Sequence, residues 1–120
     1  MAYWESKTNG MTQTISKKDF QKTVIDTTSL SLVQFTREWS GACQIMSPMF
    51  EEMAKAYRGQ ARFYTVDVEQ EAGLHHEYGV LELPTILFFR QGRVIDHIAG
   101  LSPKNVMITK IENALNREIN

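Results

Sequence analysis

Short apolar runs alternate with amphipathic helical patterns along most of this chain, and this alternation restricts the fold more than any other feature. The run "LSLVQFT" at residues 30–36 is almost continuously apolar, which is typical of a strand covered on both faces. Residues 41–57 follow with apolar side chains at three- and four-residue steps, which predicts an amphipathic helix. A buried strand followed by a helix of this kind indicates an α/β protein.

The remaining segments continue the alternation and end in a hairpin. A capped helix start follows Ser16, and Pro48 inside the helix at residues 41–57 predicts a bend there. Gln91-Gly92 is a short loop that predicts a tight antiparallel hairpin. The other expected elements are a small strand at residues 12–15, a strand at 61–69, a short helix at 71–80, strands at 84–90 and 93–99, and a last helix from Pro103. This order predicts an α/β fold with a central mixed β-sheet flanked by helices on both faces.

Length and charge narrow the class of protein. With 120 residues the chain can build one hydrophobic core, so we expect a single domain over residues 12–120 after a polar extension at residues 1–11. The chain carries 13 Lys and Arg against 14 Asp and Glu, which argues against nucleic acid or an anionic membrane as the main partner. No apolar run is long enough to cross a membrane, and the first ten residues lack a secretory pattern. We therefore expect a cytoplasmic monomer.

The single cysteine, Cys43, limits the metal and redox chemistry. One cysteine excludes an intrachain disulfide, a thiolate-rich zinc site and a Cys-ligated iron–sulfur cluster within one chain. His75 and His76 are adjacent on a predicted helix, so they point about 100° apart, and neither has a companion at the spacing that metal sites favour. We interpret them as solvated helix residues and expect no metal and no cofactor.

Four motifs resemble the thioredoxin family in type, order and spacing. They are "LVQFTREWSGACQIMSP", "YTVDVEQ", "YGVLELPTILFFRQGR" and "AGLSP", and the resemblance runs from about Thr12 to the last helix. It implies the thioredoxin fold, in which an active-site turn stands at the N-terminus of a kinked helix and a cis-proline faces that turn. By position this proline is Pro84, and cis peptide bonds occur almost only before proline.

The departures from the family pattern cluster at its chemistry. The family's Trp-Cys-Gly-Pro-Cys-Lys reads Trp-Ser-Gly-Ala-Cys-Gln at residues 39–44, so the hydroxyl of Ser40 replaces the sulfur that would attack a disulfide. Gln34 stands where the family has a buried aspartate that moves a proton to or from the second cysteine, and an amide cannot titrate. Because sulfur, carboxylate, proline and lysine all differ, we interpret the site as naturally altered rather than as one engineered Cys→Ser change.

Two main functions fit these residues. In the first, the chain is unable to run dithiol–disulfide exchange and binds an extended peptide or partner protein, because the docking features match the family while the sulfur chemistry does not. The surface for this binding would comprise Trp39, Ser40, Gly41, Ala42, Leu83, Pro84 and Thr85. In the second, the chain is an atypical monothiol disulfide oxidoreductase in cell redox homeostasis, and Cys43 forms a mixed disulfide with a protein or small thiol.

The exposure of Cys43 separates these alternatives. The N-terminus of a helix favours an ionised thiol, whereas burial disfavours it and makes the thiol inert. A Cys43-linked dimer under oxidising conditions is a third alternative that also needs an exposed thiol. Ser40 has a structural role under every alternative, because serine is a preferred helix N-cap.

Overall fold

The computed structural model describes residues 12–117, and the extension expected at residues 1–11 lies outside them. The elements are, in chain order, β1 (Gln13–Thr14), α2 (Lys17–Phe20), the π-helical segment η1 (Gln21–Ile25), β2 (Ser31–Thr36), α3 (Gly41–Ala56), β3 (Arg62–Asp67), α4 (Leu74–Glu77), β4 (Thr85–Arg90), β5 (Arg93–Ala99) and α5 (Lys104–Asn116). Every helix and strand expected from the sequence is present, and the bounds differ by a few residues. The first helix changes from α to π geometry after Phe20.

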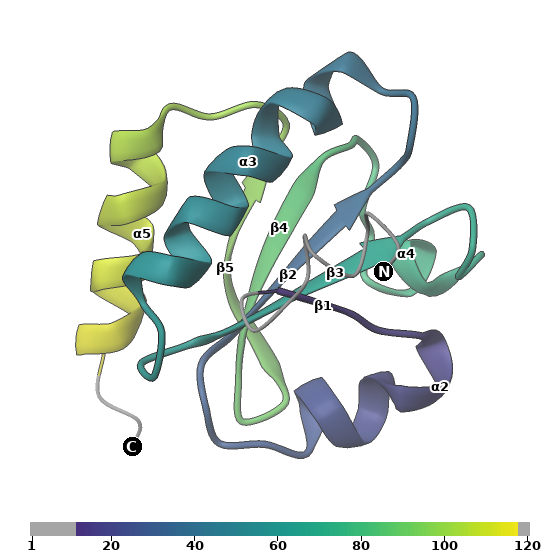
Figure 1. Cartoon of the computed structure of the whole chain (residues 1–120). Coiled ribbons are helices and arrows are strands. Elements are labelled where there is room, and N and C mark those ends of the chain that lie inside the picture. The colour runs from purple at the N-terminus through teal and green to yellow at the C-terminus, as the bar shows by residue number, and fades with distance from the viewer. Residues whose placement is uncertain (1–11, 118–120) are drawn as a thin grey trace, which may run out of the picture.

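The strands form one mixed sheet in the order β1-β3-β2-β4-β5 (Figure 1). β1 and β2 run parallel to β3, whereas β4 is antiparallel to β2 and β5 is antiparallel to β4. Gln91 and Gly92 both have positive φ, 51° and 79°, which allows two residues to reverse the chain between β4 and β5. The predicted mixed sheet and its closing hairpin are confirmed.

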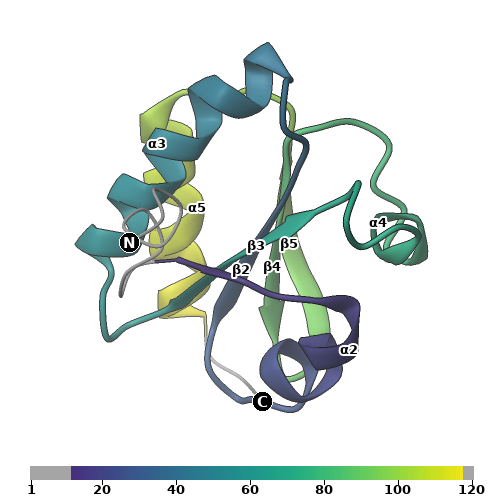
Figure 2. The same cartoon turned by 45° about the vertical axis from the view of Figure 1, so that its right-hand side comes forward.

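Helices cover both faces of the sheet. α3 and α5 pack on one face, and α2 and α4 lie on the other (Figures 1 and 2). Side chains alternate along β2, so Leu32 joins the core under α3 and α5 while Val33 joins the core on the opposite face. Both side chains are fully buried. The near-continuous apolar pattern of β2 therefore has the cause that the sequence predicted.

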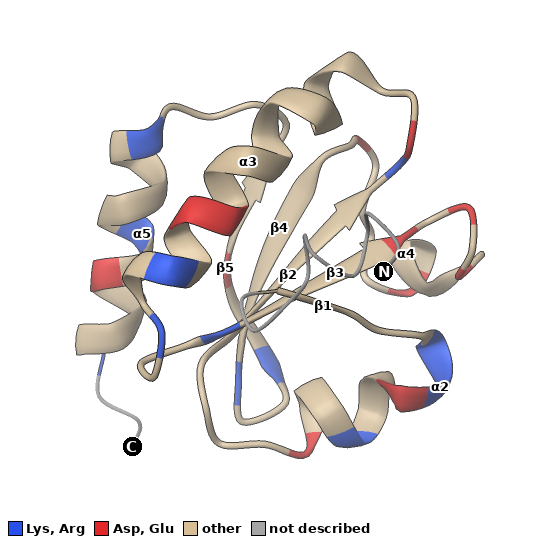
Figure 3. Ribbon diagram, in the orientation of Figure 1, with Lys and Arg blue, Asp and Glu red and all other residues tan. Residues whose placement is uncertain are grey.

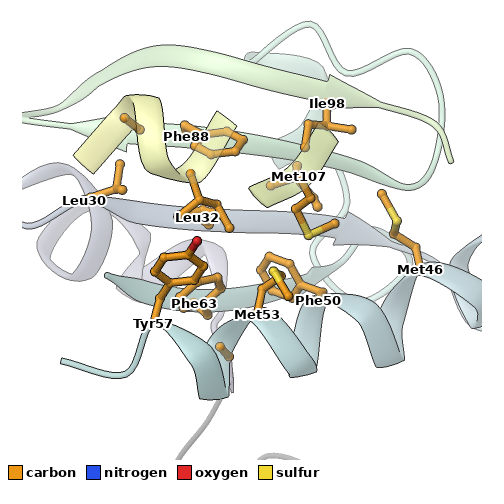
Figure 4. Close-up of a cluster of buried hydrophobic side chains, with 14 residues drawn as sticks. Leu30, Leu32, Met46, Phe50, Met53, Tyr57, Phe63, Phe88, Ile98 and Met107 are labelled. Atoms are coloured by element: carbon orange, nitrogen blue, oxygen red, sulfur yellow. The ribbon is translucent and has the colours of Figure 1, made fainter. Parts of the chain in front are cut away.

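The core under α3 and α5 brings four elements together. Figure 4 shows Leu32, Phe50, Phe88 and Met107 turned toward one another from β2, α3, β4 and α5. The three methionines of α3 belong to this layer, since two are buried in the cluster and the third packs against its edge. They fill the core, as an unbranched, adaptable side chain does well.

Charged residues of both signs are interspersed along the ribbon of the helices and loops in Figure 3. Lys17 pairs with Glu77 at 2.8 Å between α2 and α4, and Lys104 pairs with Glu52 between α5 and α3. All four side chains are about half exposed, so each pair stabilises the fold by at most about 1 kcal/mol. Within residues 12–117, no helix is long and apolar enough to cross a membrane.

Tyr57 joins the end of α3 to α5. Its hydroxyl donates a hydrogen bond of 2.7 Å to Glu112 Oε2, and its side chain is buried. Burial, followed by the hydrogen bond and the charge of Glu112, raises the pKa of Tyr57 to about 12. Since this folded pKa exceeds the unfolded value of about 10, the stabilisation is complete below pH 10 and is lost as the pH rises toward 12.

We expect Tyr57→Phe to remove this alkaline loss of stability. The free energy of unfolding of the unmodified chain should fall between about pH 10 and pH 12, and the Tyr57→Phe variant should show a shallower slope. Denaturant titrations at several pH values in this range measure the slope. Tyr64→Phe, which removes the hydroxyl of another buried tyrosine, is the matched control for the substitution itself. Equal slopes in the Tyr57→Phe variant and the unmodified chain would contradict the assignment.

Candidate functional site

The β2–α3 turn (residues 37–42) places Trp39 at the surface under backbone strain. Its φ is 70°, in the left-handed region, and its side chain is 83% exposed. This conformation costs a bulky residue about 1–3 kcal/mol, and such strained residues concentrate at functional sites. An indole this exposed buries too little surface to offset the strain by packing. The sequence left open whether Trp39 merely covers the turn, and its exposure argues against that role.

Ser40 caps α3. Its backbone is extended, with φ −97° and ψ 125°, and its hydroxyl oxygen accepts a 3.3 Å hydrogen bond from the N–H of Cys43. Such a cap stabilises a helix by about 1 kcal/mol. Beyond it, Gly41 is exposed with no neighbouring atom within 4 Å of the place a Cβ would take, and Ala42 is half-buried. The hydroxyl of Ser40 thus has a structural partner, while the surface above the turn is open.

Cys43 lies beneath this turn. Its side chain is only 2% exposed, and its Sγ accepts a hydrogen bond of 3.5 Å from the N–H of Arg37. A thiol reacts with disulfides or small thiols only when it is accessible and ionised. The first turn of α3 must therefore open before the sulfur of Cys43 can reach a partner sulfur.

Gln34 lies behind the same helix, in the middle of β2. It is 2% exposed, and its Nε2 donates a 3.4 Å hydrogen bond to Ser47 Oγ on α3. Its Oε1 is buried and has no hydrogen-bond partner among the residues that the structure describes. Sequence reasoning missed Ser47, although its position four residues after Cys43 places both on one side of the helix. The polar position behind the turn is therefore occupied by two neutral groups that exchange no proton at neutral pH.

The proline segment (Leu83–Thr85) lies beside the end of β2. Thr85 pairs with Phe35 in the antiparallel ladder, which brings the segment to the edge from which the β2–α3 turn departs. The Leu83–Pro84 peptide bond is cis, and the Pro84 carbonyl accepts a 2.7 Å hydrogen bond from the N–H of Gly100. Pro84 and Thr85 are buried, whereas Leu83 is half-buried.

The backbone of Leu83 is unpaired. Leu83 belongs to no helix or strand. Its N–H and its carbonyl form no backbone hydrogen bond with any residue in the range 12–117. Backbone donors and acceptors form hydrogen bonds wherever they can, so a free pair at the surface is open to water or to another chain. The proline segment thus offers one N–H and one carbonyl for pairing with an extended chain.

Exposed apolar side chains gather at this end of the sheet. Five large apolar side chains are exposed within residues 12–117, namely Trp39, Ile45, Leu81, Val94 and Leu101. All except Val94 come from the β2–α3 turn, the start of α3, and the loops before β4 and after β5. The strand directions bring these segments to the end where β2 finishes. Leu81 and Leu101 were missed at the sequence level, since a single apolar residue in a loop carries no periodic signal, whereas Ile45 belongs to the predicted apolar pattern of α3 and is nevertheless exposed.

The two adjacent histidines of α4 do not diverge as the sequence predicted. The rings of His75 and His76 stack with centroids 4.0 Å apart, and Nδ1 of His75 is buried. Burial, and after it the charges of His76 and Arg37, hold the pKa of His75 below its usual range. The prediction that the two side chains point apart was wrong, because rotation about the side-chain bonds can overcome the angle set by the helix, while His76 is exposed as predicted and His75 is half-buried.

A mixed sheet covered by helices on both faces, with a capped helix N-terminus beside a cis-proline segment, defines a protein of the thioredoxin-fold class. The family model described as Thioredoxin matches residues 11–113. Thioredoxin of Chlorobaculum thiosulfatiphilum is 33% identical over 95 residues, which cover 79% of this chain and 88% of that protein. Thioredoxin 2 of Chlorobaculum tepidum is 30% identical over 95 residues, with coverage of 79% and 87%. The chain belongs to the thioredoxin family.

Membership of the family does not restore its dithiol chemistry. The chain has one cysteine, which is a free thiol, so it cannot form the intrachain disulfide through which dithiol exchange proceeds. The family also does not fix a compartment, since the pea relative is named "Thioredoxin M-type, chloroplastic" and is 30% identical over 100 residues. The cytoplasmic location stays a prediction.

Proposed function

We propose that this member of the thioredoxin family binds an extended peptide of a partner protein across the β2–α3 turn and the proline segment, without dithiol–disulfide exchange. The observation that carries the proposal is the unpaired backbone of half-buried Leu83 beside the end of β2. An extended chain can pair with a free N–H and carbonyl as an added strand, with main-chain hydrogen bonds supplying affinity. This mode of binding needs no sulfur.

Trp39 supports the same function from the other side of the site. An indole that is 83% exposed offers a large apolar surface with one hydrogen-bond donor, and such side chains dominate binding energies at interfaces. The strained backbone of Trp39 has no compensation in packing, which fits a side chain held ready for a partner. Ile45 and Leu101, both more than half exposed, extend the apolar surface around it.

The monothiol alternative has less support. It requires a mixed disulfide at Cys43, and that sulfur is 2% exposed beneath the capped first turn of α3. A redox-dependent dimer through Cys43 meets the same obstacle. The binding function avoids it, because Trp39, Ile45 and Leu101 lie at the surface and Leu83 has a free backbone.

We expect Trp39→Ala to weaken peptide binding at least about tenfold, since aromatic anchors carry much of the binding free energy. Peptides of roughly twelve residues selected from a random display library, under reducing conditions, provide the ligands. Nuclear magnetic resonance titration should show shifts at Trp39 and Leu83, and Lys55→Ala, an exposed change at the far end of α3, serves as the control. Selected peptides that bind the Trp39→Ala variant equally well would argue against the site. Repeated turnover of a protein disulfide by the purified chain would refute the function itself.

A further inference from the structure

We propose that the groove beside β5 accepts an apolar side chain flanked by a basic residue of the same partner peptide. This inference rests on the proposed function and deepens it by naming the class of peptide. The groove, called here the β5 groove, has a volume of about 370 Å³ and lies between the Tyr78–Glu82 segment and the β4–β5 hairpin. Its walls include Tyr78, Leu81, Glu82, Leu87, Val94 and Ala99. This volume is near the lower end of the range of about 300–1,000 Å³ for ligand sites, so it suits one or two side chains.

The floor and rim of the β5 groove are largely apolar. Leu87 of β4 forms the buried floor, while Ala99 and Val94 of β5 are exposed, Val94 at 44%. Leu81 on the opposite rim is 95% exposed. Ile98 is the only buried residue of β5, so this strand lacks the cover that the central strands have. Exposed apolar surface around a hollow favours a ligand with an apolar side chain.

Glu82 gives the β5 groove its charge. The side chain is exposed, and it forms no ion pair with any residue in the range 12–117. Its carboxylate leans over Gly100, since Oε2 would lie 2.9 Å from a Cβ built there. No Lys or Arg lines the groove, and its one residue with a basic side chain is His97. A single unpaired acid on an apolar rim is complementary to a ligand that carries a cation next to an apolar group.

The β5 groove is continuous with the proline segment. Leu81 and Glu82 directly precede Leu83, and the Glu82 carbonyl accepts a 2.7 Å hydrogen bond from the hydroxyl of Thr85. Thr85 itself lines the groove. A peptide paired with the backbone of Leu83 therefore continues naturally past Glu82, with alternate side chains available for the groove.

The centre of β5 is protected against strand addition. The N–H of His97 donates a 2.8 Å hydrogen bond to Asp96 Oδ1, and the Ile95 carbonyl accepts a 3.1 Å hydrogen bond from Arg117 Nη1. Backbone groups already bonded to side chains do not offer a ladder to another strand. The ligand therefore meets the β5 groove through its side chains, while its backbone pairs at Leu83.

Three capped peptides of about eleven residues test the proposal. Each has a Gly and Ser background and a different centre: Arg-Leu-Arg, Glu-Leu-Glu or Arg-Ser-Arg, and the symmetric flanks make chain direction irrelevant. Nuclear magnetic resonance titration of the full chain measures the affinity for each peptide and identifies the residues that the peptide affects. We expect the Arg-Leu-Arg peptide to bind most tightly, about tenfold above Arg-Ser-Arg and at least about threefold above Glu-Leu-Glu. The amide resonances of Leu87, Val94 and Ala99 should shift with it.

Variants separate the charge, the groove and the turn. Glu82→Gln should abolish the preference for Arg over Glu, whereas the matched control Glu69→Gln, also exposed, should keep it. Val94→Asn should lower the affinity for Arg-Leu-Arg to that for Arg-Ser-Arg. Equal affinities for all three peptides, no binding of any, or no shift at the groove residues would overturn the proposal. Trp39→Ala separates a failure of the proposed function from a failure of the groove proposal. If this variant bound the three peptides with unchanged affinities and the groove resonances still shifted, the proposed function would be contradicted, while the selectivity of the β5 groove would stand.

Discussion

Ser40→Cys is expected to give the chain measurable disulfide reductase activity, and a second change, Gln34→Asp, to raise that activity by a further factor of about 10². The first change places a thiol at the open N-cap of α3, where the helix dipole favours the thiolate. The second returns a titratable carboxyl to the position behind the helix that Gln34 and Ser47 now occupy. General acid–base catalysis contributes about 10²–10⁴ in rate, which sets the size of the second gain.

Turnover of a protein disulfide with an excess of reductant measures both variants. Ser102→Cys adds a half-buried thiol in the loop after β5 and, as the matched control, should give no turnover. Thermal unfolding checks that the Gln34→Asp variant still folds, since aspartate has a shorter side chain and loses the hydrogen bond that Gln34 donates to Ser47. If the single and double variants turned over at the same rate, a proton-transfer role for position 34 would be excluded. If neither turned over, the scaffold itself would lack the geometry for exchange.

Cys43 is expected to react with an aromatic disulfide reagent at least about 10³ times more slowly in the folded chain than in denaturant. Its sulfur is 2% exposed and accepts a hydrogen bond from the N–H of Arg37, so reaction requires the first turn of α3 to open. Opening free energies in stable regions approach that of global unfolding, for which equilibrium constants are about 10³–10⁸. Stopped-flow absorbance gives the two rates.

The same reagent applied to the Ser102→Cys variant provides the reference, because one of its two thiols should react at a faster, accessible rate. A Cys43 rate within about tenfold of that of the denatured chain would restore the monothiol alternative. Gel mobility without reductant is a second readout. A Cys43-linked dimer of the folded chain would likewise restore the monothiol alternative, since such a dimer also needs an exposed sulfur.

Local patterns predicted most of the fold. The apolar run of β2, the helical period of α3 and the Gln91-Gly92 turn depend on neighbouring residues, and all three appear where the sequence placed them. The bounds moved where tertiary contacts compete with local preference, as in the short α4 and the π geometry of η1. The predicted divergence of His75 and His76 was wrong because helix geometry sets the direction of Cβ and leaves the ring free to turn.

The sequence by itself determined which chemical groups the site possesses. One sulfur, a hydroxyl at Ser40 and an amide at Gln34 exclude an intrachain dithiol reaction whatever the fold. Only the tertiary structure decided which groups a partner can reach. The burial of Cys43, the free backbone of Leu83 and the groove beside Glu82 each arise from segments far apart in the chain. Exposure is a property of all the atoms that surround a group, and no local pattern contains it.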